Sequence, residues 1–172
     1  MNPPTRFNLI MATEIERKFL VRSDAWRDRV EASIVMRQFY LAVGSDRSVR
    51  IRIADGRRAK LTLKFGSNLL IRDEFEYSID LADALEMEAH AVGDVIEKTR
   101  YHVRHAGYLY EVDVFDGKLA GLIVAELETP DRVATAQLPA WLGREVTGDQ
   151  RYSNATLAVS TVTEPTVRAL AS

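Results

Sequence analysis

The sequence contains no cysteine, which excludes disulfide scaffolds, cysteine-ligated zinc sites and thiol catalysis. It has only three histidines, and they do not form an HExxH-type array. Any bound metal must therefore be held by oxygen or histidine, and the sequence favours carboxylate oxygens, which suit Mg²⁺, Mn²⁺ or Ca²⁺. A Walker A loop, a GxGxxG turn and other glycine-rich phosphate cradles are also absent, and this absence disfavours the common nucleotide-binding folds.

Long apolar runs are missing as well. No uncharged stretch approaches the roughly 18–20 residues that a membrane helix needs, and the first dozen residues lack the apolar core of a signal peptide. The formal net charge of −2 gives no general reason to expect nucleic-acid or membrane binding. We therefore expect a cytoplasmic protein with a small-molecule partner, and its oligomeric state stays open between a monomer and a homodimer.

Length and composition fit one globular domain. The chain has 172 residues, of which 47% are hydrophobic and 28% are charged, enough to bury a core without covalent cross-links. No internal repeat, linker or low-complexity stretch divides it. We expect a domain over residues 12–160, preceded by a flexible leader at 1–11 and followed by a flexible tail at 161–172.

Alternation of apolar and polar residues dominates the chain, and a period of two is typical of half-buried strands. Glycines and an Asp-Gly pair separate the alternating segments at positions that suit tight turns. The expected strands are Thr13–Arg22, Ile34–Val43, Ser48–Ala54, Lys60–Lys64, Ile71–Ile79, Thr99–His105, Leu109–Phe115 and Leu122–Glu128. Such a series of strands predicts a mainly β (α+β) fold.

Helices are expected to be few and short. Capping signals place them after Ser23, from Asp80 to Val92, from Pro139, and after Ser153. They interrupt the strands rather than alternate with them, so an α/β fold is disfavoured.

Charged side chains occupy one face of most expected strands, because residues two apart on a strand point to the same side. The sets that share a face are Glu14, Glu16 and Lys18; Arg50 and Arg52; Lys60, Thr62 and Lys64; Glu74 and Glu76; Arg100, His102 and Arg104; Glu111 and Asp113; and Glu126 and Glu128. Like charges about 6–7 Å apart repel by about 2–3 kcal/mol at an effective dielectric near 20. Repeated pairs of this kind indicate that counter-ions bind there.

A solvated outer face is the alternative explanation, since charges two residues apart are common on such faces. It explains a single strand better than a pattern that recurs in most strands. We predict instead an eight-stranded antiparallel closed β-barrel, a tunnel with a charged interior and peripheral helices. The segment with Leu81, Leu85 and Ala89 along one stripe is the expected cover for the apolar outside. In the interior, carboxylates would bind divalent metal, and Lys and Arg would bind phosphate.

Several of these segments resemble the motifs of a known family. The run EIERKFL is similar to the ExExK signature of the CYTH, or triphosphate tunnel metalloenzyme, superfamily, and RQFYL resembles a Q-x-Y-L segment of its short bacterial members. The same order continues through VRIR, LTLK, EFEY, EKTRY, EVDVF, AELE and DQRYSN. The resemblance implies an eight-stranded tunnel that binds a triphosphate and one or two Mg²⁺ or Mn²⁺ ions.

The resemblance also implies roles for individual residues. The positions that match the phosphate clamp are Lys18, Arg50, Arg52, Lys64, Lys98, Arg100 and Arg151. The positions that match metal ligands are Glu14, Glu16, Asp113, Glu126 and Glu128. Lys18 and Tyr40 match a lysine–tyrosine pair with a catalytic role in some short members, and Glu76 is expected to bind a second metal or to orient water in catalysis.

Two positions depart from the family pattern. Gln150 stands where many relatives have a basic residue, which leaves Arg151 as the only strong donor there. Phe39 replaces a glycine that is common in the motif, so the local geometry of Tyr40 stays open, and a role for Tyr40 as an ordinary strand aromatic stays open with it.

Some polar and aromatic residues have simpler explanations than a place in the site. Lys60, His102 and Arg104 are expected on the surface, whereas Trp26 and Trp141, near expected helix starts, are expected to pack against the core.

The leading functional hypothesis is hydrolysis of inorganic tripolyphosphate to pyrophosphate and phosphate by a divalent-metal-dependent triphosphatase. A class IV-type adenylate cyclase and a thiamine or nucleoside triphosphatase would use the same tunnel. A non-catalytic polyphosphate-binding module is the alternative from a different class. No base-binding pocket is recognisable in the sequence, which favours the smallest substrate.

Overall fold

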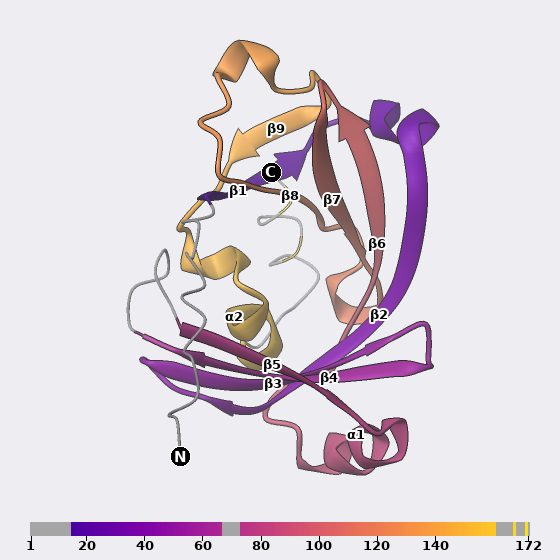
Figure 1. The fold of residues 1–172 in the computed structure, drawn as a ribbon, viewed down its shortest axis with the longest axis vertical. Helices are drawn as coiled ribbons and strands as arrows, with labels where there is room; N and C mark the ends of the chain where they lie inside the picture. The colour runs from indigo at the N-terminus through magenta and orange to yellow at the C-terminus, as the bar shows by residue number, and fades with distance from the viewer. Residues whose placement is uncertain (1–14, 67–72, 161–166, 168–170, 172) are drawn as a thin grey trace, which may run out of the picture.

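The computed structural model describes residues 15–66, 73–160, 167 and 171. Among these residues, nine strands form one antiparallel sheet in the order β5-β4-β3-β2-β6-β7-β8-β1-β9 (Figure 1). The strands are β1 (Ile15–Val21), β2 (Val30–Val43), β3 (Arg47–Ala54), β4 (Arg58–Phe65), β5 (Asp73–Ile79), β6 (Ile96–His105), β7 (Tyr108–Phe115), β8 (Ile123–Thr129) and β9 (Leu142–Glu145).

Within the described residues, short helices lie between the strands, and the last two of them lie after β9. The α-helices are α1 (Leu81–Met87) and α2 (Asn154–Val159), and the 3-10 helices are η1 (Asp24–Arg29), η2 (Glu88–His90), η3 (Gly117–Leu119), η4 (Thr135–Gln137) and η5 (Gln150–Tyr152). No helix in the described part of the chain is both long and apolar enough to cross a membrane.

The eight segments that were predicted as strands correspond to β1 through β8, so the alternation identified them correctly. The largest difference is at β2, which begins at Val30 rather than at Ile34. The first residues of β2 are mostly exposed and show no alternation of burial, and their strand state follows from pairing with β6. The alternation of apolar and polar residues therefore located the strands, whereas pairing with β6 extended β2 beyond its predicted start.

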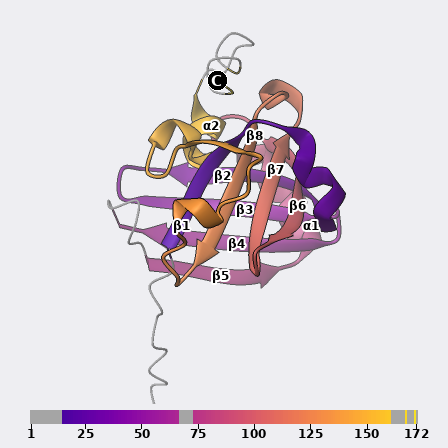
Figure 2. The same ribbon diagram turned by 90° about the horizontal axis from the view of Figure 1, so that it is seen from above.

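The sheet bends along β2, whose two ends pair with different neighbours. Residues 36–43 pair with β3, whereas residues 30–38 pair with β6, and each ladder contains one irregularity. β2 to β5 therefore form one layer and β6, β7, β8, β1 and β9 form the other (Figure 1). Figure 2 shows that the strands of the two layers cross steeply. We call the side of the sheet that lies between the layers the concave face, and the opposite side the convex face.

The prediction of a closed, eight-stranded barrel is wrong. A ninth strand, β9, lies where a helix was predicted from Pro139, and it pairs with the Phe19–Val21 end of β1. The carbonyl of Trp141 accepts a hydrogen bond from the backbone N–H of Arg22 at 3.0 Å, which draws this segment onto the sheet. Because β9 occupies that edge of β1, and no ladder joins β5 to β1 or β9 among the described residues, the sheet stays open.

The convex face carries the predicted apolar surface. Phe39 and Ile51 are fully buried there, in one cluster with Ala84 of α1. Trp26 and Trp141 pack in a second convex cluster, which confirms their predicted packing role. α1 contacts the sheet through a different stripe from the predicted one, since Leu85 is exposed.

The second α-helix lies on the concave side, between the two layers (Figure 1). Leu157 of α2 packs in one cluster with Tyr40 and Ile96, whose side chains point to the concave face. Ser153 caps the helix as predicted, because its hydroxyl accepts a hydrogen bond from the N–H of Thr156 at 3.1 Å. The prediction of peripheral helices therefore holds for α1 but not for α2, which covers part of the concave face with apolar side chains.

Candidate functional site

Strand register brings ionic side chains of distant segments together on the concave face. Lys18 of β1 is the direct partner of Glu126 of β8, and Arg100 of β6 is the direct partner of Asp113 of β7. Because paired residues on neighbouring strands point to the same face, the sets expected from the sequence join into one surface. Glu14 lies outside the described residues.

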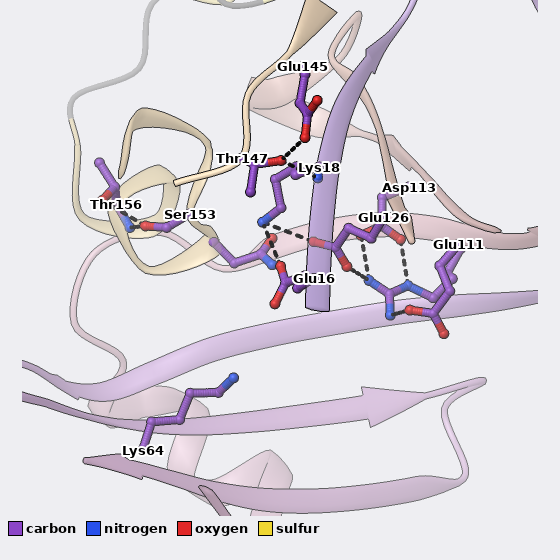
Figure 3. A network of polar contacts seen from close by, with 12 residues as sticks. Glu16, Lys18, Lys64, Glu111, Asp113, Glu126, Glu145, Thr147, Ser153 and Thr156 are labelled. Atoms are coloured by element: carbon purple, nitrogen blue, oxygen red, sulfur yellow. Dashed lines mark hydrogen bonds and ion pairs between the residues drawn. The ribbon is translucent and has the colours of Figure 1, made fainter. Parts of the chain in front are cut away.

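Lys18 is at the centre of one ionic network, which Figure 3 shows from close by. Its Nζ lies 3.0 Å from Glu126 Oε1 and 3.5 Å from Glu16 Oε1. Burial disfavours the ammonium, but the charges of Glu126 and Glu16 outweigh burial and raise the pKa of Lys18. Burial likewise acts on Glu126, yet Lys18 and Arg100 hold the pKa of its carboxyl well below its usual range. Both groups are therefore charged at neutral pH.

Asp113 holds the second part of this network. It is almost fully buried, and its carboxylate accepts hydrogen bonds from Arg100 at 2.7 and 2.8 Å and from Lys98 at 2.5 Å. Arg100 also contacts Glu111 and, at 2.9 Å, Glu126. Burial lowers the pKa of Lys98 to about 8, although Asp113 offsets part of the effect. Both carboxylate oxygens of Asp113 are thus engaged with cations of the protein.

A second set of polar side chains lies on β3, β4 and β5. The Nη2 atom of Arg50 donates to Thr62 Oγ1 at 3.1 Å and lies 3.9 Å from Glu74. Lys64 Nζ lies 2.8 Å from the same glutamate. Lys64 extends from its strand toward the layer that carries Lys18 (Figure 3). Cations from both layers thus face the space between them.

Arg52 differs from these cations. Its Nε is buried and has no hydrogen-bond partner among the described residues. Burial and the charges of Arg50 and Arg100 lower the pKa of Arg52, although a guanidinium stays protonated in a folded protein. The charges of Glu76 and Asp113 offset this lowering only in part, so a guanidinium close to two others favours an anionic ligand.

The three residues with predicted catalytic roles carry different charges. Burial raises the pKa of the Tyr40 hydroxyl, and the neighbouring arginines offset this only in part. Burial acts on Glu76 too, but a hydrogen bond and the charge of Lys60 outweigh it and lower the pKa of that carboxyl. Lys18 and Tyr40 therefore keep their protons at neutral pH and can donate hydrogen bonds, whereas Glu76 can accept a proton or orient water.

Glu16 and Glu128 are the carboxylates best suited to a divalent cation. They are direct cross-strand partners, and both are exposed. Like charges directly opposite each other destabilise a sheet, and a hard cation between them removes the repulsion. Within the described part of the chain, no three acidic or histidine side chains converge tightly enough to hold a metal by themselves. A Mg²⁺ or Mn²⁺ ion on this pair would complete its coordination with water and phosphate oxygens, as Mg²⁺ commonly does.

Arg151, which was predicted as a phosphate ligand, is exposed in the structure. Its exposed guanidinium pairs with Asp149 at 2.6 Å. A different arginine, Arg144 of β9, donates to the hydroxyl of Tyr152 at 2.8 Å, and that tyrosine belongs to the cluster on the concave face. Sequence reasoning missed Arg144 because its segment was predicted as a helix. It also gave no role to Gln38, although the spacing of two from Tyr40 placed both on one face.

Comparison with models of protein families identifies the family of this chain. A model of the CYTH domain matches residues 12–160. The chain belongs to the CYTH family. The inorganic triphosphatase of Acetivibrio thermocellus is 42% identical over 148 residues, which cover 86% of this chain and 94% of the relative. The inorganic triphosphatase of Nitrosomonas europaea is 38% identical over 152 residues, which cover 86% and 98%.

A solved inorganic triphosphatase has the same fold. The crystal structure of an inorganic triphosphatase aligns with a TM-score of 0.66 at 36% identity and covers 86% of this chain and 95% of that chain. The resemblance of the sequence motifs to the CYTH superfamily is thereby confirmed. In this CYTH chain, the concave face combines a carboxylate pair with arginines that lack full compensation, so it can bind a metal and a polyanion together.

Proposed function

We propose that this CYTH protein is a divalent-metal-dependent triphosphatase that hydrolyses inorganic tripolyphosphate to pyrophosphate and phosphate. The observation that carries the proposal is the pair of Arg50, which is buried, and Arg52, which is half-buried, on the concave face of a sheet that also carries the Glu16–Glu128 pair. Among the described residues, the side-chain Nε atoms of both arginines lack a hydrogen-bond partner. The inorganic triphosphatases that are 38–42% identical support the same reaction.

In phosphoryl transfer, the side chains of the concave face would have different roles. Arg50, Arg52 and Lys64 would bind phosphate oxygens, and Lys18 and Tyr40 would donate hydrogen bonds where negative charge develops. A divalent cation on the glutamate pair supplies further charge neutralisation when it is bound. Water attacks the terminal phosphorus, the bond to the bridging oxygen breaks, pyrophosphate leaves, and the proton of the water passes to solvent through Glu76.

The concave face favours a substrate without a base. Tyr40, Phe115 and Tyr152 are the aromatic residues of its apolar cluster in the described part of the chain, and all three are buried together with α2. A nucleobase or thiamine ring would therefore find no open aromatic surface there on which to stack. Inorganic tripolyphosphate needs no such surface.

A panel of substrates tests the function. With Mg²⁺ or Mn²⁺, the purified protein is expected to release phosphate from tripolyphosphate faster than from ATP, thiamine triphosphate or pyrophosphate, and EDTA should abolish release. Colorimetric phosphate assays and chromatography of nucleotides measure both outcomes. Formation of cyclic AMP from ATP would replace the proposal with a cyclase. Tight binding of tripolyphosphate without turnover would replace it with a binding module.

The metal site has its own prediction. Glu128→Gln is expected to raise the Mg²⁺ concentration for half-maximal activity by at least about 10-fold, because one ligand loses its charge. Metal titrations of the initial rate measure the change. Glu31→Gln serves as the matched control, since Glu31 is an exposed glutamate that pairs with Arg104. Equal metal requirements in both variants would argue against the Glu16–Glu128 pair as the metal site.

A further inference from the structure

Gln38 is a buried polar side chain whose amide has no hydrogen-bond partner among the described residues. It lies on β2 at 0% exposure. Neither its Oε1 nor its Nε2 forms a hydrogen bond with any residue that the structure describes. A buried amide without hydrogen bonds destabilises a fold, and an apolar residue of the same size would avoid that cost. Groups that are unfavourable for folding concentrate at functional sites.

The register places Gln38 beside Arg52. The two residues are direct partners on β2 and β3, and Ile96 of β6 is the partner on the other side. Direct partners have Cβ atoms about 4.5–5.5 Å apart, so the amide is within reach of the guanidinium. The Nε of Arg52 is also buried without a hydrogen bond to the described chain. An acceptor and a donor that both lack a hydrogen-bond partner in the described part of the chain therefore lie next to each other on the concave face.

We propose that Gln38 is a positioning residue for Arg52. When a triphosphate binds, the amide oxygen accepts a hydrogen bond from the guanidinium and fixes the direction in which Arg52 presents its remaining N–H groups to a phosphate oxygen. The inference rests on the proposed function, and it adds a residue that does not touch the substrate itself.

An amide suits this role better than a carboxylate. Lys18 and Arg100 both pair with Glu126, and such pairing cancels part of their charge. Gln38 can orient the neighbouring guanidinium without neutralising it, which leaves the full charge of Arg52 for the anionic ligand.

Two substitutions separate orientation from folding. Gln38→Met keeps the length of the side chain and removes its polar atoms. It is expected to leave the melting temperature equal or higher, yet to raise KM for magnesium tripolyphosphate by at least about 10-fold, with a smaller change in kcat. Gln38→Glu is expected to raise KM further, because the introduced carboxylate neutralises Arg52. Met36→Leu, a buried position on the same face two residues away, is the control and should leave KM unchanged.

A double-mutant cycle tests whether the effect passes through Arg52. In an Arg52→Met background, the additional Gln38→Met substitution should leave KM unchanged. Independent effects that add, an unchanged KM in the single variant, or loss of folding in Gln38→Met would each overturn the inference. Loss of folding counts against it because the amide would then stabilise the structure.

A binding measurement keeps this test independent of turnover. If the wild-type protein released no phosphate, the proposed function would fail, and the variants would be compared by the rise in melting temperature that tripolyphosphate produces with Mg²⁺. A smaller rise in Gln38→Met than in the wild type supports the role of Gln38. An equal rise, or no rise in the wild type, overturns it.

Discussion

Lys18→Met is expected to lower kcat for tripolyphosphate by at least about 100-fold while the protein remains folded. A preorganised donor that faces developing negative charge contributes about 100- to 1,000-fold to kcat when it is removed alone. The ammonium of Lys18 is such a donor, because Glu126 and Glu16 keep it protonated. The fold should survive, since Glu126 keeps its contact with Arg100 at 2.9 Å and no buried carboxylate is left alone. Initial rates and circular dichroism measure the two effects.

Lys118→Met provides the matched control for this substitution. Lys118 is an exposed lysine of η3 that pairs with Asp94, and its removal should leave kcat unchanged. Full activity in Lys18→Met would rule out a catalytic role for the ammonium. Loss of the circular dichroism signal would assign Lys18 to folding instead.

Asp113→Ala is expected to lower the free energy of unfolding by about 3–5 kcal/mol, the typical result of removing one partner of a buried ion pair. Asp113 accepts from Lys98 and Arg100, which are both buried. Arg100 would keep Glu126, but Lys98 would lose its only ion pair among the described residues. Urea denaturation without metal measures the change. The exposed Asp46, which pairs with Arg47, is the control, and Asp46→Ala should stay close to the wild type.

The same experiment distinguishes two roles for Asp113. The family resemblance implies a metal ligand, whereas the structure gives both of its oxygens to cations of the protein. A metal ligand without a structural role would leave metal-free stability unchanged and would raise the Mg²⁺ requirement. That result would contradict the structural role and favour the ligand role.

Much of the candidate site could be predicted from the sequence because strand geometry is local. The direction of a side chain on a strand depends only on its position along that strand. The alternation therefore assigned Lys18, Arg52 and Glu128 to one face before any partner strand was known. It also placed Gln38 on that face, but an amide carries no charge and adds nothing to a charge pattern. Gln38 became a candidate only because its amide is buried without a hydrogen-bond partner among the residues that the structure describes.

The sequence by itself determined the eight main strands, the division of charged and apolar residues between two faces, and the membership of the CYTH family. The tertiary structure decided that the sheet stays open, that α2 covers part of the concave face, and which carboxylate meets which cation. The physical reason is distance along the chain. β9 has four residues, too few for a readable alternation, and it exists only because β1, more than a hundred residues earlier, offers an edge. Asp113 likewise became a structural ion-pair partner only through the register that sets it beside Arg100.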